Sequence, residues 1–175
     1  SIDVAASHAS LGDPSRRPAM LVVTDGWQWC SPYDASTRFF PVDAVKRAKA
    51  KGINVFVVGF GRGVDVLTLN RMAKEAGTAF PGCDPTGADW MAPKKCYFQA
   101  EDQGQLQMAL SMIAVQVSAE VCDGIDNNCD GQVDEHLTRG CQSACGGGSE
   151  TCNAGKWGAC DAVQPTKETC DGKDN

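Results

Sequence analysis

The chain has 175 residues and a formal net charge of −6, all of which comes from its last third. Residues 1–119 hold 12 basic and 11 acidic side chains, whereas residues 120–175 hold 4 and 11. The sequence contains neither a basic patch of the kind that binds nucleic acid nor an apolar run of about 18 residues that could span a membrane. The composition therefore predicts a near-neutral domain, residues 1–119, followed by a small acidic domain, residues 120–175.

Two unbroken apolar runs in the first domain are typical of strands in a parallel sheet that is buried on both faces. They are residues 19–26, AMLVVTDG, and residues 53–61, INVFVVGFG. Between them, residues 41–52 carry apolar side chains at helical spacing and end in a glycine, which favours a helix with a C-terminal cap. A strand, a helix and a second strand in this order predict a βαβ unit.

The rest of the first domain predicts three helices and one short strand. Helices are expected over residues 1–13, 63–77 and 101–117, and a strand over residues 95–100. The expected apolar stripe of the last helix consists of Leu106, Leu110, Ile113 and Val117.

These elements, in this order, resemble the second half of a von Willebrand factor type A domain. The matching stretches are LVVTDG, GINVFVVGFG, LNRMAKEAG and CYFQAEDQGQLQMALSMIA. The resemblance implies an α/β fold for residues 1–119, with a Rossmann-like, doubly wound parallel sheet. In that family a ligand binds through Mg²⁺ or Ca²⁺ at a metal ion-dependent adhesion site, which lies at the C-terminal ends of the strands.

Only one metal ligand of that family has a counterpart here, which is the aspartate of the TDG turn, Asp25. The family's DxSxS motif has no match, because residues 3–7, DVAAS, have Ala5 in place of the first serine. The resemblance therefore implies that the N-terminal half of the domain, in the same or a cleaved chain, pairs with residues 21–23. Without it, those residues would form an apolar edge that invites aggregation.

Asp25 and two tryptophans that follow it are the candidate ligand-binding residues of the first domain. Trp27 and Trp29 lie on the loop that would border the adhesion site, where a protein or glycan ligand would bind. The alternative is that Asp25 only caps a turn and that the two indole rings pack over the edge of the sheet.

The acidic domain contains the spacing of a calcium loop, DNNCDGQVDE. Oxygen donors fall at positions 1, 3, 5, 7 and 9: Asp126, Asn128, Asp130, the Gln132 carbonyl and Asp134. A glycine at position 6 allows the sharp turn, but position 12 is Leu137, which cannot bind a cation. We expect Glu135 or Asp123 to supply the bidentate carboxylate, and Ca²⁺ to be the cation. The alternative is a solvated acidic turn without a metal.

The same stretch resembles the CDGxDNxCDGxxDE motif of bacterial surface proteins, which recurs in tandem and is associated with metal binding. Residues 168–175, ETCDGKDN, begin a second copy and stop before its next Cys, Asp and Gly. We therefore expect a disulfide-rich repeat over residues 120–175 whose second copy is truncated.

Seven of the ten cysteines lie in residues 120–175, which predicts a disulfide-stabilised unit from an oxidising, extracellular compartment. The expected pairs are local: Cys83 with Cys96, Cys122 with Cys129, and Cys141, Cys145, Cys152 and Cys160 among themselves. Cys30 and Cys170 have no local partner. Zinc binding by the four clustered cysteines is disfavoured, because their spacings are not those of a zinc knuckle.

The favoured function is that of a secreted or surface-displayed bacterial adhesion protein with a calcium-stabilised stalk. An alternative is a structural subunit of an extracellular filament or coat, in which the first domain serves assembly between copies. A third, weaker hypothesis is a copper scavenger that uses His136 beside the acidic loop. We expect no enzyme, because neither His8 nor His136 stands in a setting that suggests a nucleophile and base.

Overall fold

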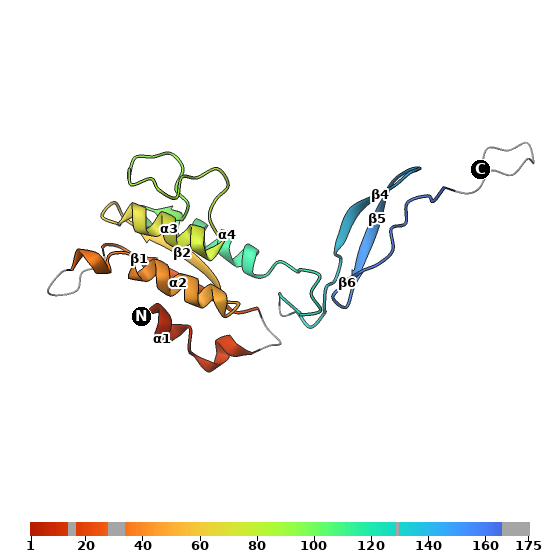
Figure 1. Ribbon diagram of the computed structural model, residues 1–175, viewed down its shortest axis with the longest axis horizontal. Coiled ribbons are helices and arrows are strands. Elements are labelled where there is room, and N and C mark those ends of the chain that lie inside the picture. Colours follow the sequence, from red (N-terminus) through yellow and green to blue (C-terminus); the bar gives the residue numbers. More distant parts are fainter. Residues whose placement is uncertain (14–16, 28–33, 129, 166–175) are drawn as a thin grey trace, which may run out of the picture. The chain divides into compact units, whose positions relative to one another are not determined.

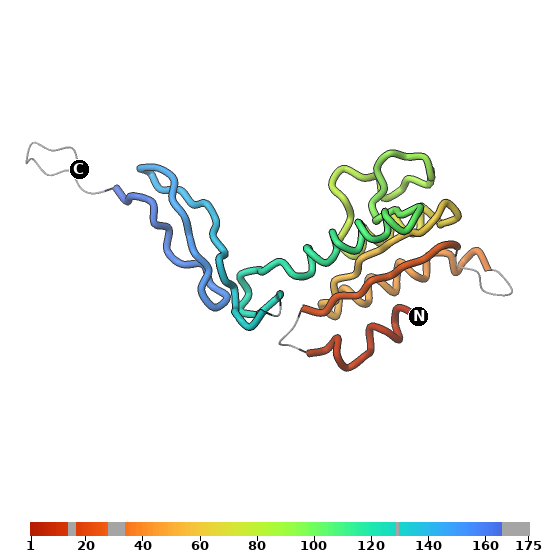
Figure 2. The backbone as a smooth tube through the Cα atoms, turned by 180° about the vertical axis from the view of Figure 1, so that it is seen from behind, coloured from red at the N-terminus to blue at the C-terminus, as the bar shows by residue number. Residues whose placement is uncertain are grey.

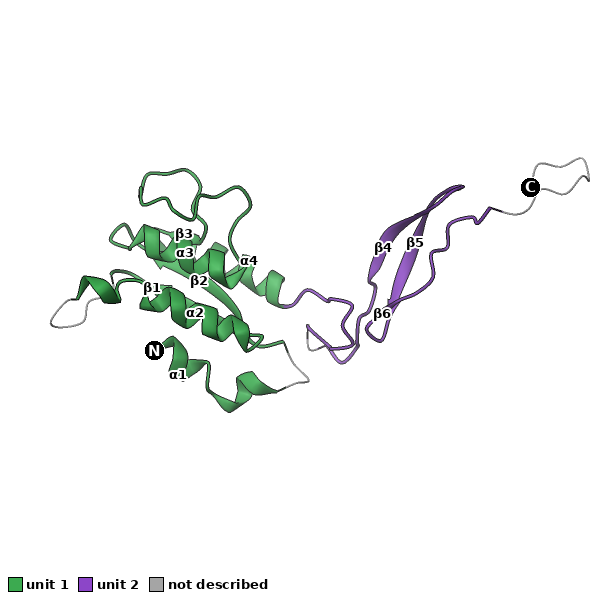
Figure 3. Ribbon diagram, viewed as in Figure 1, with its two compact units in different colours: residues 1–117 green, residues 118–175 purple. Residues whose placement is uncertain are grey.

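The computed structural model consists of two compact units, Ser1–Val117 and Ser118–Asn175 (Figure 3). Each unit is described by itself. The structure describes residues 1–13, 17–27, 34–128 and 130–165. Within these ranges, no helix is both long enough and apolar enough to cross a membrane. Four residues singled out in the sequence lie outside the described ranges: Trp29, Cys30, Cys129 and Cys170.

A three-stranded parallel sheet forms the centre of the first unit (Figure 1). Its strands are β1 (Ala19–Thr24), β2 (Asn54–Phe60) and β3 (Phe98–Ala100), and they lie in that order. β1 pairs with β2 from Ala19 opposite Asn54 to Thr24 opposite Gly59. The parallel sheet and its connecting helices confirm the mixed α/β architecture expected from the apolar runs.

Two helices cover one face of the sheet, α2 (Phe40–Ala50) and α3 (Val66–Ala76). Because side chains of a strand alternate between faces, Val55 and Val57 of β2 point into this layer. α3 ends at Gly77, whose backbone is left-handed with a φ of 82°, as the sequence predicts.

One helix, α4 (Gln103–Val117), covers the opposite face (Figure 2). Ala109 and Ile113 are buried against residues of β2 and β3, and Leu106 and Val117 pack against them in part. The prediction that Leu110 belongs to the buried stripe is wrong, because 39% of this residue is exposed. The small Ala109 side chain faces β2 and β3 instead. Leu110, the next residue, therefore lies at the border of the contact between α4 and the sheet.

β1 forms one edge of the sheet, and it leaves apolar side chains exposed. Leu21 and Val23 are 42% and 50% exposed, whereas Met20 and Val22 pack against the core on the other face. In the part of the chain that the structure describes, β1 pairs only with β2.

The N-terminal segment forms two short helical turns rather than the continuous helix predicted over residues 1–13. They are α1 (Ile2–Ala5) and a 3₁₀ helix at Ala9–Gly12. His8 separates them with an extended backbone, and its ring nitrogen accepts a hydrogen bond from the Ser10 amide. A side chain that accepts a hydrogen bond from the backbone in this way starts a new turn and prevents the preceding helix from continuing.

Two further features complete the first unit. A 3₁₀ helix at Ala35–Thr37 leads into α2, and the predicted disulfide joins Cys83 to Cys96. Lys95 holds the loop between these cysteines by donating hydrogen bonds to three carbonyls, those of Asp89, Trp90 and Ala92.

The second unit contains an antiparallel sheet with the order β4–β5–β6. Its strands are β4 (Thr138–Ser143), β5 (Gly146–Asn153) and β6 (Lys156–Trp157). Among the described residues of this unit, the only buried side chains are those of Asn127, Asp134, Cys152 and Ala162. Such a small apolar core cannot offset the chain entropy that folding removes, so other contacts have to hold the unit together.

Two disulfides supply part of that stability, and one of them corrects the sequence-based expectation. Cys122 is bonded to Cys152 rather than to Cys129. Cys141 is bonded to Cys160, a pair that agrees with the expected bonding among the clustered cysteines. Cys145 is exposed and unbonded among the described residues. Local pairing fails because the end of β5 returns beside Cys122, so that the Cα atoms of Cys122 and Cys152 lie 5.7 Å apart.

Candidate metal centre

The predicted calcium loop is held in a tight turn by hydrogen bonds from its own backbone. Asp126 Oδ2 accepts from the Gly131 amide at 2.9 Å, and Asn128 Oδ1 accepts from the Asp130 amide at 2.8 Å. Asp130 Oδ1 in turn accepts from the Gln132 amide at 2.9 Å. Gly131 has a φ of 91°, which glycine adopts without strain. The donors at positions 1, 3, 5 and 7 therefore belong to one compact turn.

Glu135 carries the feature that most directly suits a cation. Its Oε1 accepts a hydrogen bond of 2.7 Å from the Asn128 side-chain amide, while its Oε2 is buried with no hydrogen-bond partner among the described residues. A buried carboxylate oxygen without a partner is costly, and a positive ion is a natural partner for it. Glu135 therefore fits the role of the acidic ligand expected from outside the loop spacing.

Glu120 contributes to the same centre, although it was not among the predicted site residues. Its Oε1 accepts from the Asn128 amide at 2.7 Å and its Oε2 from the Asp134 amide at 3.2 Å. A signal for it was present in the sequence, because Glu120 and Glu168 occupy the same position in the two copies of the motif.

Asp134 lies in a different setting from the one expected at position 9. It is only 2% exposed, and its carboxylate accepts hydrogen bonds from the amides of Asp123, Gly124 and Gly155. Burial alone would raise the pKa of Asp134, but the hydrogen bonds from these amides outweigh it and lower that pKa. The side chain thus stays ionised and holds backbone segments together.

Asp123, the other candidate for the bidentate carboxylate, takes part in a local turn. Its Oδ1 accepts from the Ile125 amide at 3.0 Å and from the Asn127 side chain at 3.5 Å. Asn127 is buried and accepts a hydrogen bond from the Val121 amide. This structural role makes Glu135 the better candidate for the bidentate ligand.

The donor set consists of oxygens only, which suits Ca²⁺ or Mg²⁺ better than a transition metal. The four side chains that offer them are Asp126, Asn128, Asp130 and Glu135, with Gln132 offering its carbonyl. Within the described ranges, however, no three acidic, histidine or cysteine side chains lie close enough together to hold an ion. The carboxylates face backbone amides, so a cation has to draw them together when it binds.

The expected adhesion site of the first unit is less developed. Asp25 follows β1 and is exposed, and among the described residues it belongs to no group of three or more acidic, histidine or cysteine side chains that could hold an ion. Trp27 is 44% exposed, and the Arg38 guanidinium lies 4.7 Å from the centre of its ring. Trp27, but not Asp25, lines a cavity of about 190 Å³ at the carboxyl end of β1.

Asp65, which the sequence did not single out, is the most constrained carboxylate at this edge. It is buried and forms two hydrogen bonds with Arg38, at 2.8 and 2.7 Å, and one with the Thr68 hydroxyl at 2.6 Å. Burial alone would raise the pKa of Asp65, but these hydrogen bonds and the charge of Arg38 lower it. Its position three residues before Thr68, at the start of α3, was the available signal.

A family model described as "Putative metal-binding motif" matches residues 117–135 and 160–175, and its name refers to copper binding. Two stretches of the chain are therefore similar to a motif associated with metal binding. The first matched segment contains the whole calcium-loop spacing together with Glu120 and Glu135, and the second contains the repeated ETCDGKDN stretch. No curated protein and no solved structure matches the chain.

Proposed function

We propose that the second unit binds Ca²⁺ through the loop at residues 126–135 and that the ion stiffens a disulfide-bonded repeat. The buried, unpartnered Oε2 of Glu135 beside Asn128 carries this proposal. Asp126, Asn128, Asp130 and Glu135 are the side chains that would hold the ion, and the Gln132 carbonyl would complete the set. The ion would supply positive charge to this turn and draw its carboxylates together.

Calcium is favoured over copper by the chemistry of the loop. Copper sites in proteins use imidazole or sulfur ligands, whereas every candidate donor here is an oxygen. His136 follows Glu135 directly but is exposed and forms no part of the turn. Extracellular calcium modules bind with dissociation constants of about 0.1 to 1 mM, which suits a loop with ligands that have to be gathered on binding.

Isothermal titration calorimetry of the metal-free chain with Ca²⁺, Mg²⁺ and Cu²⁺ tests the proposal. We expect saturable Ca²⁺ binding in the range of about 0.1 to 1 mM. Glu135→Gln is expected to weaken it, whereas His136→Ala is expected to leave it unchanged. Tight Cu²⁺ binding that His136→Ala abolishes, with no response to Ca²⁺, would support the copper hypothesis instead.

For the first unit we propose a role in ligand binding rather than catalysis, as part of a von Willebrand factor type A domain in an extracellular adhesion protein. The helices on both faces of the parallel sheet support this proposal, as do the exposed Leu21 and Val23 on the edge strand. A strand from the N-terminal half of that domain would cover this edge, and its residues would join Asp25 in a Mg²⁺ or Ca²⁺ site. The disulfides of both units support an extracellular location.

This second proposal is tested by hydrogen exchange and by ligand binding in the intact source protein. If a further strand covers β1, the Leu21 and Val23 amides are protected there, and chelation releases a protein or glycan ligand without unfolding the domain. Adhesion that persists in chelator, with a filament that still assembles, would favour the structural subunit instead.

A further inference from the structure

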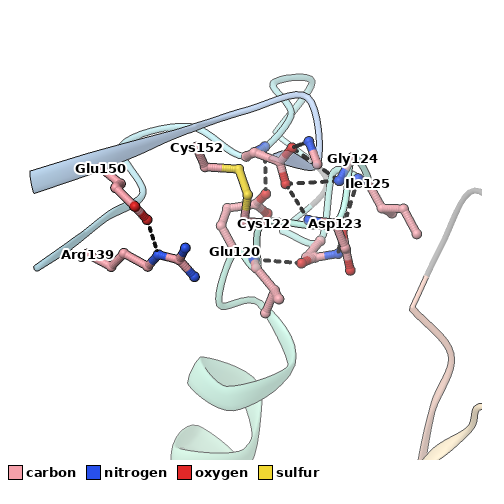
Figure 4. Close-up of a disulfide and its surroundings, with 12 residues drawn as sticks. Glu120, Cys122, Asp123, Gly124, Ile125, Arg139, Glu150 and Cys152 are labelled. Atoms are coloured by element: carbon pink, nitrogen blue, oxygen red, sulfur yellow. Dashed lines mark hydrogen bonds and ion pairs between the residues drawn. A yellow bond between two sulfur atoms is a disulfide. The ribbon is translucent and has the colours of Figure 1, made fainter. Parts of the chain in front are cut away.

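Two segments of the second unit that are distant in sequence form one junction beneath the metal loop. The bridge between Cys122 and Cys152 joins them covalently, and Figure 4 shows it beside the turn of Asp123 and Gly124. The Asp134 carboxylate adds hydrogen bonds to the amides of Asp123 and Gly124 on one side and to the Gly155 amide on the other. The turn between β5 and β6 is thereby fastened to the start of the metal-binding motif.

The backbones at this junction approach so closely that a side chain on Gly155 would be crowded. A Cβ atom on Gly155 would lie 3.0 Å from the carbonyl carbon of Asp123 and 3.0 Å from the Gly124 nitrogen. Gly155 and Gly124 also have φ values of 79° and 81°, which other residues rarely adopt. The contact is therefore a built feature of the fold rather than a loose approach of two surface turns.

The junction is connected directly to the groups that would hold the cation. The Asp134 amide donates to Glu120 Oε2, and Glu120 Oε1 accepts from the Asn128 amide at position 3 of the loop. Asp134 also immediately precedes Glu135, whose Oε2 is the buried oxygen without a partner. A shift of Asp134 would therefore move both Asn128 and Glu135.

We propose that Asp134, Gly155 and the Cys122–Cys152 bridge are positioning elements of the metal centre, without binding the ion themselves. The cation-binding unit then extends to the turn after β5, beyond the segment at residues 117–135 that the family model matches. This inference rests on the proposed Ca²⁺ binding. Outer residues that orient metal ligands typically contribute about 10- to 100-fold to metal affinity.

Linkage makes the relation reciprocal, because whatever the bridge adds to Ca²⁺ affinity, bound Ca²⁺ adds to the stability of the bridge. Reduction by a dithiol such as dithiothreitol breaks the Cys122–Cys152 bond, leaves two protein thiols and oxidises the dithiol to its cyclic disulfide. Saturating Ca²⁺ should therefore raise the dithiothreitol concentration at which half of the Cys122–Cys152 bridge is reduced at equilibrium. The bridge between Cys141 and Cys160 lies outside the junction and serves as an internal control.

Two variants and two matched controls test the proposal in the full chain. Asp134→Asn keeps the shape of the side chain but places an NH₂ group against backbone amides, and Gly155→Ala adds a Cβ atom at the close contact. Glu150→Gln removes an equal charge elsewhere in the unit, and Gly140→Ala adds a methyl group where nothing lies within 4 Å. Calorimetry with Ca²⁺ should show at least about a tenfold loss of affinity for the first two variants and less than about a twofold change for the controls.

A local effect is separated from unfolding by NMR spectra of the metal-free variants. We expect the β4–β5 amide resonances of Asp134→Asn to keep their wild-type positions while the Ca²⁺ affinity falls. In the wild type, we expect Ca²⁺ to lower the fraction of Cys122 and Cys152 alkylated after equilibration with a given dithiothreitol concentration more than that of Cys141 and Cys160.

The outcomes separate this inference from the function on which it rests. Wild-type Ca²⁺ binding that both junction variants retain, with equal reduction of the two bridges, would overturn the inference and leave the proposed function standing. Loss of the β4–β5 resonances in both variants would also overturn it, because the residues would then support the whole fold. A wild-type chain that binds no Ca²⁺ would overturn both.

Discussion

The two units of this chain reach stability by opposite routes. The first buries two apolar clusters on the two faces of a parallel sheet, with Val57 and Val58 of the same strand fully enclosed on opposite sides. Among its described residues, the second buries almost no apolar side chain and relies on two disulfides and on the carboxylate of Asp134. In the first unit the carboxylate of Asp65 is buried beside Arg38. In the second unit the carboxylate of Asp134 is buried against backbone amides.

This difference shows what the acidic side chains of the second unit contribute to its structure. Asp126, Asp130 and Asp134 all accept hydrogen bonds from main-chain N–H groups, so negative side chains take the place of a core in organising the backbone. Such a unit should respond strongly to reductants and cations, and the first unit should respond to changes in its core and in its buried ion pair.

The largest expected effect is that of reduction. Each disulfide typically contributes about 2 to 4 kcal/mol, and the second unit has little else to compensate for the loss of two. With excess dithiothreitol we expect the β4–β5 amides to lose their protection against hydrogen exchange, while those of β2 remain protected. Chelation alone should leave the hairpin folded, and a unit that survives reduction but unfolds in chelator would contradict the account.

Loss of the ion pair between Asp65 and Arg38 in the first unit should have the next largest effect. Asp65→Ala removes the carboxylate that accepts from Arg38 and the cap of α3, so we expect a loss of about 2 kcal/mol in the free energy of unfolding of this unit. Urea denaturation followed by circular dichroism measures it. Asp34→Ala, which removes an exposed cap of a three-residue helix, is the control and should have a much smaller effect.

The same carboxylate makes the first unit sensitive to acid. Because the folded-state pKa of Asp65 lies below its unfolded value of about 3.9, its contribution is fully present above that value and is lost as the pH falls through the folded pKa. The difference in unfolding free energy between the wild type and Asp65→Asn should therefore shrink on acidification below about pH 4. A difference that stays constant down to about pH 2 would show that the charge of Asp65 is not responsible.

Calcium should produce the smallest of these effects, and only in the second unit. At about 1 mM Ca²⁺ and a dissociation constant near 0.1 mM, binding stabilises the unit by about 1.4 kcal/mol. We expect Glu135→Gln to remove most of this gain, as measured by thermal unfolding with and without Ca²⁺. Glu150→Gln should retain it, and an equal gain in both variants would exclude Glu135 as a ligand.

Elements that depend on nearby residues could be predicted from the sequence. β1, β2 and α3 follow from apolar runs, helical spacing and the stop at Gly77, and the Cys83–Cys96 bridge follows from a short separation. The exposure of Leu110 could not be predicted, because Ala109 and Leu110 lie on adjoining sides of α4 and only one of them can face the strands. That outcome depends on how the helix packs against the sheet.

The candidate site could be predicted only where its contacts are local. The spacing of Asp126, Asn128 and Asp130 indicates the turn, but the role of Asp134 depends on the Gly155 amide, which lies in a later hairpin. The bond between Cys122 and Cys152 was missed for the same reason. Both contacts form only once β5 has returned to the loop, and residue spacing within one motif carries no information about that return.

The central claim is that the loop at residues 126–135 binds Ca²⁺. An NMR titration of the ¹⁵N-labelled, oxidised chain with CaCl₂ tests it most directly, because it locates the ion as well as detecting it. We expect saturable shifts of the Asp130, Gly131 and Gln132 amides at about 0.1 to 1 mM Ca²⁺, with the resonances of β2 unchanged. Amides of this loop that show no saturable shift up to about 10 mM Ca²⁺ would contradict the account, since that concentration exceeds the usual range of extracellular calcium modules.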